Sequence, residues 1–272
     1  MADKQRLDVY MVKNGIVSGR EIANECILQG TVLVNGKTVT KASFAVDDTD
    51  TVDFVGESLA YVSRGGLKLE KALAVSALSV AGYTALDIGA STGGFTHCLL
   101  QHGAEKVFAL DVGHDQLHPL LRCDPRVINL EGTDIRSDRA KTEIPLGGVD
   151  IITADVSFIS LRSVLPYALP FLKRNGWLVV LIKPQFEAGR TAVGKNGIVR
   201  DRAIHIKILR EMLDLFSSLQ CSPTVLTGSP IRGGAGRQQG NVEYLAVLRY
   251  PAQEPFPLWD CRRIVEETFT IQ

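Results

Sequence analysis

The chain has 272 residues, 45% of them hydrophobic and 22% charged, an ordinary balance for a globular protein with a sizeable core. No apolar run approaches the roughly 20 residues that span a bilayer, and the N-terminus lacks the apolar region of a signal peptide, so we expect a cytoplasmic protein with no membrane partner. Because 30 Lys and Arg balance 30 Asp and Glu, the net charge argues against a nucleic-acid partner, and the placement of the charges is more informative.

Two short helices are predicted near the N-terminus. Apolar residues from Leu7 onward predict a helix that ends at Asn14-Gly15, a C-terminal cap signal. Ser18-Gly19-Arg20-Glu21 has the form of a capping box, in which the serine bonds an amide of the first turn and the glutamate reaches back. It begins a second helix, which Gly30 ends.

A hairpin is predicted after these helices. Residues 31–34 and 37–39 read as strands joined by a type I′ turn at Asn35-Gly36, and residues 51–55 as a last strand. The pattern R-L-D-x-x-x-V-x-x-G-x-x-x-x-R-x-x-A-x-x-x-I-x-x-G-x-V-x-V-N-G-K, over about residues 5–55, resembles the alpha-L RNA-binding motif of the small-subunit ribosomal protein S-four. The resemblance implies that phosphates are bound by Arg6, Lys13, Arg20 and Lys37. A solvated helix surface without an RNA role is the alternative.

Beyond Tyr83 the sequence alternates apolar runs with helical stretches, which is typical of a parallel sheet covered by helices. We expect strands at 85–88, 107–111, 127–130, 149–154, 177–182, 223–227 and 244–250, and helices at 93–101, 160–172 and 202–219. The predicted fold class is α/β, with a Rossmann-like sheet and a small N-terminal α+β domain. The predicted domains are 1–58 and 63–272, joined by a linker at 59–62.

A glycine-rich turn follows the first of these strands, in Asp87-Ile88-Gly89-Ala90-Ser91-Thr92-Gly93-Gly94-Phe95. Such a turn lets the backbone approach a ligand and points a helix N-terminus at it. The spacing differs from the G-x-G-x-x-G of dinucleotide-binding enzymes, which disfavours the alternative of a nicotinamide dehydrogenase. Instead, D-x-G-x-x-x-G-G-F resembles the first motif of class I methyltransferases, which bind S-adenosylmethionine.

That resemblance implies a cofactor site spread over three strand ends. Asp111, 24 residues after Asp87, stands where the family holds the ribose hydroxyls, and Asp134 follows the third strand where the family contacts adenine. The full set of predicted cofactor-binding residues is Asp87, Gly89, Ala90, Ser91, Gly93, Gly94, Phe95, Asp111, Val112 and Asp134. The alternatives are an exposed strand-end residue for Asp111 and a turn or cap residue for Asp134.

Four ionisable residues are expected to meet at one edge of the sheet. Asp155 and Lys183 follow the fourth and fifth strands, whose carboxyl ends share a crevice in this fold class. The last strand runs antiparallel in such folds, which brings Glu243 there too, and Lys68 comes from the first segment of the domain. A ribose hydroxyl is a poor nucleophile and needs a base. Neighbouring charges and desolvation can poise a lysine for that role, and a cation stabilises the developing alkoxide.

The set Lys68, Asp155, Lys183 and Glu243 resembles the K-D-K-E tetrad of FtsJ-like ribose 2′-O-methyltransferases. With the N-terminal motif, the chain resembles the TlyA (haemolysin A) family over nearly its full length. That resemblance implies methylation of cytidine in ribosomal RNA, with Lys183 as proton acceptor. Some members carry an Arg-x-Trp-Val linker, where this chain has Leu59-Ala60-Tyr61-Val62.

The distribution of charges and of possible metal ligands indicates which other partners are expected. Residues 183–210 hold seven Lys and Arg against two Asp and Glu, which fits a loop facing RNA or, alternatively, a solvated helix face. Arg64 is a further predicted RNA-binding residue. No metal is expected, because the five cysteines form no C-x-x-C pair and His114 and His118 lack further ligands. The expected partners are therefore ribosomal RNA and ribosomal subunits. A non-catalytic RNA-binding or ribosome-assembly protein and a membrane-active haemolysin remain the alternatives.

Overall fold

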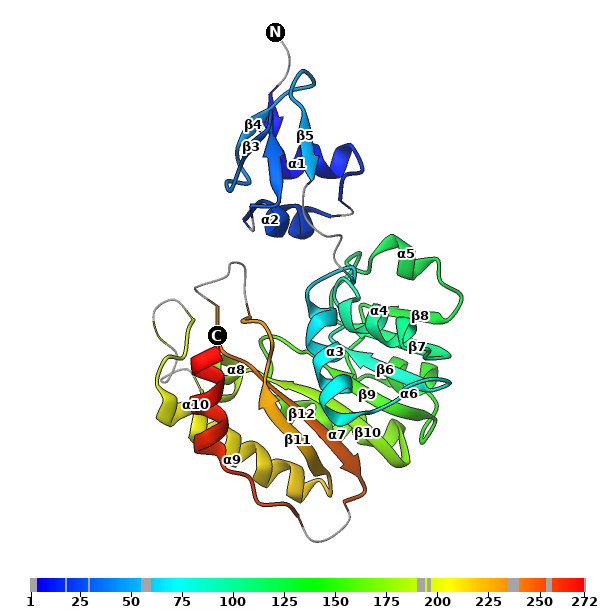
Figure 1. The fold of residues 1–272 in the computed structure, drawn as a ribbon. Coiled ribbons are helices and arrows are strands. Elements are labelled where there is room, and N and C mark those ends of the chain that lie inside the picture. Colours follow the sequence, from blue (N-terminus) through cyan, green and yellow to red (C-terminus); the bar gives the residue numbers. More distant parts are fainter. Residues whose placement is uncertain are drawn as a thin grey trace. The chain divides into compact units, whose positions relative to one another are not determined.

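The computed structural model describes residues 4–17, 19–28, 30–54, 60–189, 194, 197–233, 240–252 and 256–271. The chain divides into two compact units (Figure 1). One consists of Met1–Leu59 with Gly234–Gly240, and the other of Ala60–Gly233 with Asn241–Gln272. The finer domain and linker bounds given above stay a prediction.

The N-terminal unit contains the two predicted helices and the predicted hairpin. Its elements are β1 (Gln5–Arg6), α1 (Leu7–Lys13), α2 (Arg20–Leu28), β2 (Val32–Val34), β3 (Lys37–Thr38), β4 (Ala45–Val46) and β5 (Val52–Phe54). Asn35 and Gly36 have φ of 52° and 74°, as a type I′ turn requires. Ser18 of the predicted capping box lies outside the described residues. The antiparallel pair of β1 and β4 was not predicted, because two-residue strands carry no periodicity.

The second unit is built on a seven-stranded sheet. The strands are β6 (Thr84–Ile88), β7 (Lys106–Asp111), β8 (Val127–Glu131), β9 (Val149–Ala154), β10 (Leu172–Ile182), β11 (Ser222–Gly228) and β12 (Tyr244–Tyr250). Their order in the sheet is β11-β12-β10-β9-β6-β7-β8. Pairing is parallel from β10 to β8, whereas β12 is antiparallel to both β10 and β11. The carboxyl ends of the parallel strands and the start of β12 therefore share one edge.

Helices cover both faces of this sheet, as Figure 1 shows. Alternate residues of each strand enter different cores: Leu86 and Ile152 pack on one face, and Ala85 and Ile151 on the other. The helical elements are α3 (Gly65–Ser76), α4 (Gly94–Gln101), α5 (Pro119–Arg122), α6 (Asp138–Glu143), η1 (Leu161–Ser163), α7 (Leu165–Ala168), η2 (Leu169–Phe171), α8 (Pro184–Glu187), α9 (Arg202–Ser218) and α10 (Cys261–Ile271). Helices α3 and α4 lie on one face, and α9 and α10 on the other.

The single helix predicted at 160–172 is wrong. This stretch forms η1, α7 and η2, three short helical pieces. Pro166 and Pro170 each stand at the first or second position of a piece, where a missing N–H is tolerated. The remaining predicted strands and helices of this unit are confirmed to within one residue at each end, except that β10 begins at Leu172, five residues before its predicted start.

In the part of the chain that the structure describes, no helix combines the length and apolar character needed to cross a membrane. Over the same residues, no cluster of three or more His, Cys, Asp or Glu is placed to hold a metal ion.

Candidate active site

The four predicted catalytic side chains meet at the expected edge of the sheet. Lys68, in the first turn of α3, donates to Glu243 Oε2 at 2.7 Å, and its Nζ lies 3.7 Å from Asp155 Oδ2. Lys183, directly after β10, places its Nζ 2.6 Å from Asp155 Oδ1. Asp155 therefore stands between the two amines. These side chains come from four distant segments, and each is less than a fifth exposed.

The two amines have different surroundings. Burial would lower the pKa of Lys68, but the Asp155 and Glu243 carboxylates hold that pKa above its usual range. Among the described residues, Lys183 pairs with one carboxylate, and its Nζ also donates to the neutral Ser157 Oγ at 2.9 Å. Burial would raise the pKa of Asp155, but Lys68 and Lys183 hold that pKa below its usual range. The geometry therefore keeps Lys68 as an ammonium between two carboxylates, whereas Lys183 pairs with one of them.

A close backbone approach joins the glycine-rich turn to this cluster. Gly89 has a φ of 81°, and a Cβ there would lie 2.6 Å from the carbonyl oxygen of Asp155. The Asp155 amide in turn donates to the Ile88 carbonyl at 3.0 Å. Only glycine lets the two strand ends come this close. The turn after β6 is thereby placed against the lysine–carboxylate cluster.

The Asp111 carboxylate, at the end of β7, is held between two loops. Its Oδ2 accepts the Ser91 amide at 2.8 Å, and its Oδ1 accepts the Gly113 amide at 2.7 Å. A carboxylate has about four acceptor positions, so each oxygen can take one more donor. This leaves Asp111 able to accept two adjacent hydroxyls. Beside it, the Val112 side chain is 67% exposed and offers an apolar face.

Asp134 is already engaged by a neighbouring arginine. Its two oxygens accept from the Arg136 guanidinium at 2.9 and 2.6 Å, and Oδ1 also accepts the Arg136 amide at 2.8 Å. The turn that carries Asp134 is tied to the Asp111 edge, since the Thr133 amide donates to the Asp111 carbonyl at 2.9 Å. An adenine amine would have to share Asp134 with Arg136.

The remaining predicted cofactor residues divide between the turn and the core. Gly93 is the N-cap of α4 and Gly94 its first residue, whereas Phe95 and Ala90 are buried. Asp87 points inward: its fully buried carboxylate accepts the hydroxyls of Thr96 at 2.7 Å and Thr153 at 2.8 Å. This places Asp87 as a brace between β6, α4 and β9. Direct contact of Asp87 with a cofactor stays a prediction.

The predicted RNA-binding residues lie in both units. Arg6, Lys13, Arg20 and Lys37 belong to the N-terminal unit, and all four are exposed. Arg6 and Arg20 are held by Asp8, which is fully buried and accepts both guanidiniums at 2.9 to 3.0 Å. Arg64 precedes α3 in the second unit.

Two aromatic rings beside Lys183 were missed by the sequence reasoning. Phe158 is 92% exposed with a φ of 65°, a strained conformation for a bulky residue. Its ring lies 5.1 Å from that of Phe186, which lies 5.9 Å from Lys183 Nζ. The sequence did contain a clue to both phenylalanines, because each stands three residues after a predicted catalytic residue. The pair offers a stacking surface beside the tetrad.

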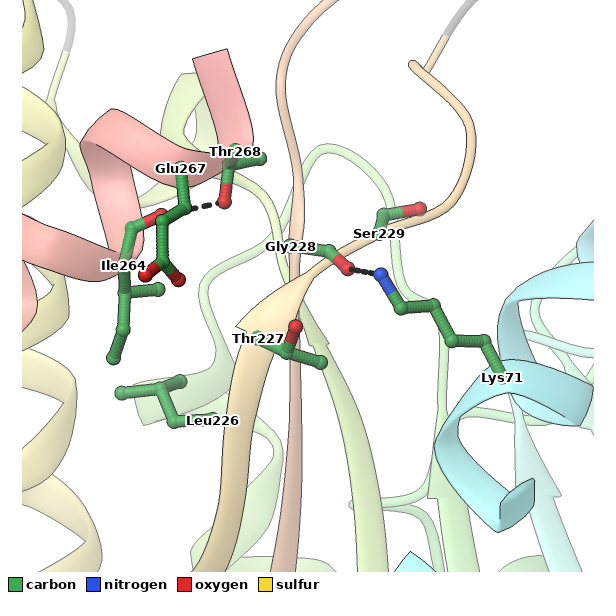
Figure 2. Close-up of a pocket in the computed structure, with 8 residues that line it drawn as sticks. All are labelled: Lys71, Leu226, Thr227, Gly228, Ser229, Ile264, Glu267 and Thr268. Carbon is green, nitrogen blue, oxygen red and sulfur yellow. Dashed lines mark hydrogen bonds between the residues drawn. The ribbon is translucent and has the colours of Figure 1, made fainter. Parts of the chain in front are cut away.

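A small cavity near Lys68 was also missed. It has a volume of about 70 Å³ and lies between α3, the end of β11 and α10 (Figure 2). Lys71, one turn beyond Lys68, donates to the Gly228 carbonyl at 2.7 Å, and burial lowers the pKa of this ammonium. Since β11 runs parallel to β10, its end lies at the same edge of the sheet as the tetrad.

Known protein families match both parts of the chain. Residues 61–250 match the family model described as FtsJ-like methyltransferase, and residues 5–52 match the S4 domain. The chain belongs to the FtsJ-like methyltransferase family. The predicted fold class, a methyltransferase sheet with an S4-type domain, is confirmed.

Several members of this family are similar over most of their length. The chain is 41% identical over 251 residues to the protein named 16S/23S rRNA (cytidine-2′-O)-methyltransferase TlyA of Mycobacterium tuberculosis, covering 92% of this chain and 91% of the relative. It is 45% identical over 244 residues to "Hemolysin A" of Brachyspira hyodysenteriae, covering 89% and 98%. A solved structure described as a candidate hemolysin of Streptococcus thermophilus is 40% identical, with a TM-score of 0.77 and coverage of 100% and 98%.

Proposed function

We propose that this chain transfers a methyl group from S-adenosylmethionine to the ribose 2′-hydroxyl of cytidine in ribosomal RNA. The observation that carries the proposal is the convergence of Lys68, Asp155, Lys183 and Glu243 beside the glycine-rich turn. The substrate class is supported by the name of the M. tuberculosis relative and by the S4 domain. The site of action would be the cytoplasm, where ribosomes are made.

The residues around Asp111 fit S-adenosylmethionine. Two free acceptor positions on Asp111 suit the ribose hydroxyls, and the exposed Val112 side chain suits one face of adenine. The turn at Gly89 gives the methionine part of the cofactor access to the backbone. When bound, S-adenosylmethionine supplies an activated methyl group on a positively charged sulfur.

The chain's own residues supply the acid–base chemistry. Lys183 in its neutral form accepts the proton of the 2′-hydroxyl as the ribose oxygen forms its bond to the methyl carbon. Lys68, kept as an ammonium by Glu243 and Asp155, stabilises negative charge developing on that oxygen. Asp155 orients both amines. The proton ends on Lys183 Nζ, beside Asp155, and the bond broken in exchange would be the donor's sulfur–methyl bond.

The surface beside the tetrad suits an extruded nucleotide. The exposed ring of Phe158, next to Phe186, can stack on a base once that base leaves its helix. Lys71 adds a positive charge near the phosphates of such a strand.

The test uses the purified full chain, methyl-labelled S-adenosylmethionine and isolated ribosomal subunits, followed by mass spectrometry of the nucleosides. We expect 2′-O-methylcytidine in the digested RNA. Methylation on a base, or no transfer to either subunit by a chain that binds the cofactor, would contradict the proposal. A Lys183→Ala variant assayed in parallel controls for contaminating methyltransferases.

A further inference from the structure

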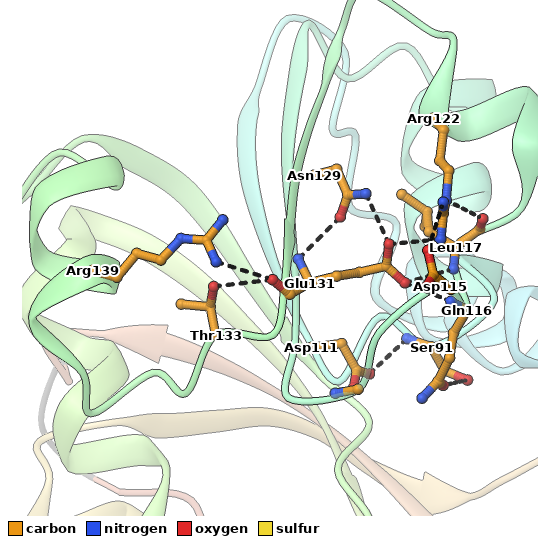
Figure 3. A network of polar contacts seen from close by, with 11 residues as sticks. Ser91, Asp111, Asp115, Gln116, Leu117, Arg122, Asn129, Glu131, Thr133 and Arg139 are labelled. Atoms are coloured by element: carbon orange, nitrogen blue, oxygen red, sulfur yellow. Dashed lines mark hydrogen bonds and ion pairs between the residues drawn. The ribbon is translucent and has the colours of Figure 1, made fainter.

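Glu131 holds the loop that follows Asp111. It is the last residue of β8, and its side chain is only 11% exposed. Its Oε1 accepts the backbone amides of Gln116 at 2.6 Å and Leu117 at 2.9 Å. Its Oε2 accepts from Asn129 at 2.8 Å and from Arg122 at 2.9 Å (Figure 3). One carboxylate thus receives four donors.

Arg122 holds the other side of the same peptide. Its Nε donates to the Leu117 carbonyl at 2.9 Å, and its second nitrogen reaches Asp115 Oδ1 at 3.2 Å. The Glu131–Arg122 ion pair therefore binds both the N–H and the C=O of Leu117. The loop needs this support, since Asp115 has a φ of 57° and α5 is only four residues long.

The loop presents its other side to Asp111. The Gly113 amide donates to one oxygen of Asp111, and the Ser91 amide to the other. Gln116 Oε1 lies 3.2 Å from the Ser91 hydroxyl, and its amide group packs on Gly113, where any Cβ would meet it. The Gln116 side chain therefore connects the two loops that flank the Asp111 carboxylate.

We infer that Glu131 is a positioning residue for cofactor binding: it fixes residues 113–117 so that Asp111 meets the ribose hydroxyls of the methyl donor. This inference rests on the proposed function. Glu131 itself is too deeply engaged with the loop to be a ligand. Its contribution acts through the backbone of Gln116 and Leu117.

The negative charge of Glu131 is essential to this role. Burial would raise its pKa, but hydrogen bonds from Asn129 and from the Leu117 and Gln116 amides hold that pKa below the usual range. A glutamine at this position would direct its NH₂ group at either the two backbone amides or Arg122. Two hydrogen-bond donors would then face each other, and those hydrogen bonds would be lost. Glu131→Gln therefore disturbs the loop without changing side-chain size.

Asp124→Asn provides a matched control. Asp124 lies just before the opposite end of β8, and its carboxylate is likewise bound by an arginine, accepting the Arg126 amide at 2.9 Å and the guanidinium at 3.0 and 2.7 Å. The control removes a similar charge and a similar ion pair far from the carboxyl edge of the sheet.

The experiment measures, for wild type and both variants, the Kd of S-adenosylmethionine by calorimetry, its KM, and kcat at saturating cofactor. For Glu131→Gln we expect Kd and KM to rise at least about tenfold, the effect of losing a charge-assisted hydrogen bond, with kcat within about twofold. Asp124→Asn should change neither constant by more than about twofold. A KM in Glu131→Gln equal to that of the control, or a fall in kcat alone, would overturn the inference.

Two further readouts separate the possible failures. A wild-type chain that binds no S-adenosylmethionine refutes the proposed function, whereas equal binding by wild type and Glu131→Gln refutes only the role of Glu131. If Glu131→Gln does not fold, Glu131→Asp decides, because it keeps the negative charge but shortens its reach to the Gln116 and Leu117 amides. We expect a severalfold higher cofactor KM for it, and an unchanged KM would overturn the inference.

Discussion

Lys68 and Lys183 share one carboxylate but differ in what else they contact. Lys68 has Glu243 as a second acidic partner, whereas Lys183 has the Ser157 hydroxyl. An arginine keeps a positive charge but cannot give up its proton near neutral pH. We therefore expect Lys68→Arg to retain measurable methyl transfer, and Lys183→Arg to lose about 10²-fold or more in kcat, the usual contribution of a general base.

The comparison is made by single-turnover methyl transfer at saturating cofactor, with cofactor affinity measured alongside. Affinity should change little in both variants. Similar activity in Lys183→Arg and wild type would show that this amine acts only through its charge.

Asp87 carries a stability cost that depends on pH. Burial raises its pKa to about 6, despite the hydrogen bonds from Thr96 and Thr153. Between about pH 4 and pH 6, Asp87 is therefore protonated in the folded state and ionised in the unfolded state. This group lowers the free energy of unfolding as pH rises through that window. Asp87→Asn keeps the shape and removes the charge. Its free energy of unfolding relative to wild type should increase from pH 4 to pH 7, by at most about 3 kcal/mol.

Urea unfolding at pH 4, 5.5 and 7 measures this difference. A difference that stays constant across the three pH values would contradict the raised pKa.

The topology of the sheet explains which site residues could be predicted from the sequence. The tetrad was placed correctly because parallel strands end at one edge and the last strand is antiparallel, which are properties of topology. Topology alone does not predict that the Asp87 side chain points into the core. Whether a carboxylate at a strand end turns into the core depends on Thr96 and Thr153, which come from two other elements. The support of the loop by Glu131 depends on Arg122 in the same manner.

At the scale of elements, the turn between β6 and α4 fixes the distance between cofactor loop and tetrad. A Cβ at Gly89 would lie 2.6 Å from the Asp155 carbonyl, and Gly89 also has a φ of 81°. Gly89→Ala should therefore shift Asp155, lower stability by about 3 kcal/mol and reduce kcat by about 10²-fold.

Gly82→Ala is its control, since Gly82 has a φ of 75° but nothing within 4 Å of a Cβ. It should lose only about 1 to 2 kcal/mol of stability, with normal kcat. Equal kcat values in the two variants, measured with thermal midpoints, would show that the close approach has no catalytic role.

In the N-terminal unit, helices α1 and α2 are joined through one buried carboxylate. Asp8 binds Arg6, just before α1, and Arg20, the first residue of α2. The hydrogen bond from Arg6, followed by that from Arg20, outweighs burial and holds the pKa of Asp8 at about 2. This stabilisation is present above about pH 4 and is lost as pH falls towards 2.

Asp8→Asn should speed amide exchange in α1 and α2 roughly tenfold at pH 7. Exchange in α3, which belongs to the other unit, is the internal control. Unchanged protection in α1 and α2 would contradict this account.

Sequence reasoning failed at two kinds of local structure, for two different physical reasons. Strands β1 and β4 have two residues each, too few for a periodic signal. Proline interrupted the apolar pattern at 160–172, so a run that looks helical forms three pieces. The long strands of the sheet were predicted well because they are buried on both faces and read as continuous apolar runs.

At the scale of the whole molecule, the chain combines an S4-type domain with an FtsJ-like methyltransferase domain. An RNA-binding module gives affinity through phosphates and carries little sequence information. On the proposed function, the choice of nucleotide falls to the second unit, where Phe158 lies against Phe186 and Phe186 against Lys183. This division predicts that modification of the cell's ribosomes depends on Lys183 even when the S4 domain is intact.

The most direct test replaces the chromosomal copy with Lys183→Ala and compares ribosomal RNA from the two strains by nucleoside-resolved mass spectrometry. The tetrad account predicts that one or two 2′-O-methylcytidines present in the wild type disappear, while every other modification stays. Full 2′-O-methylation in the Lys183→Ala strain would contradict it.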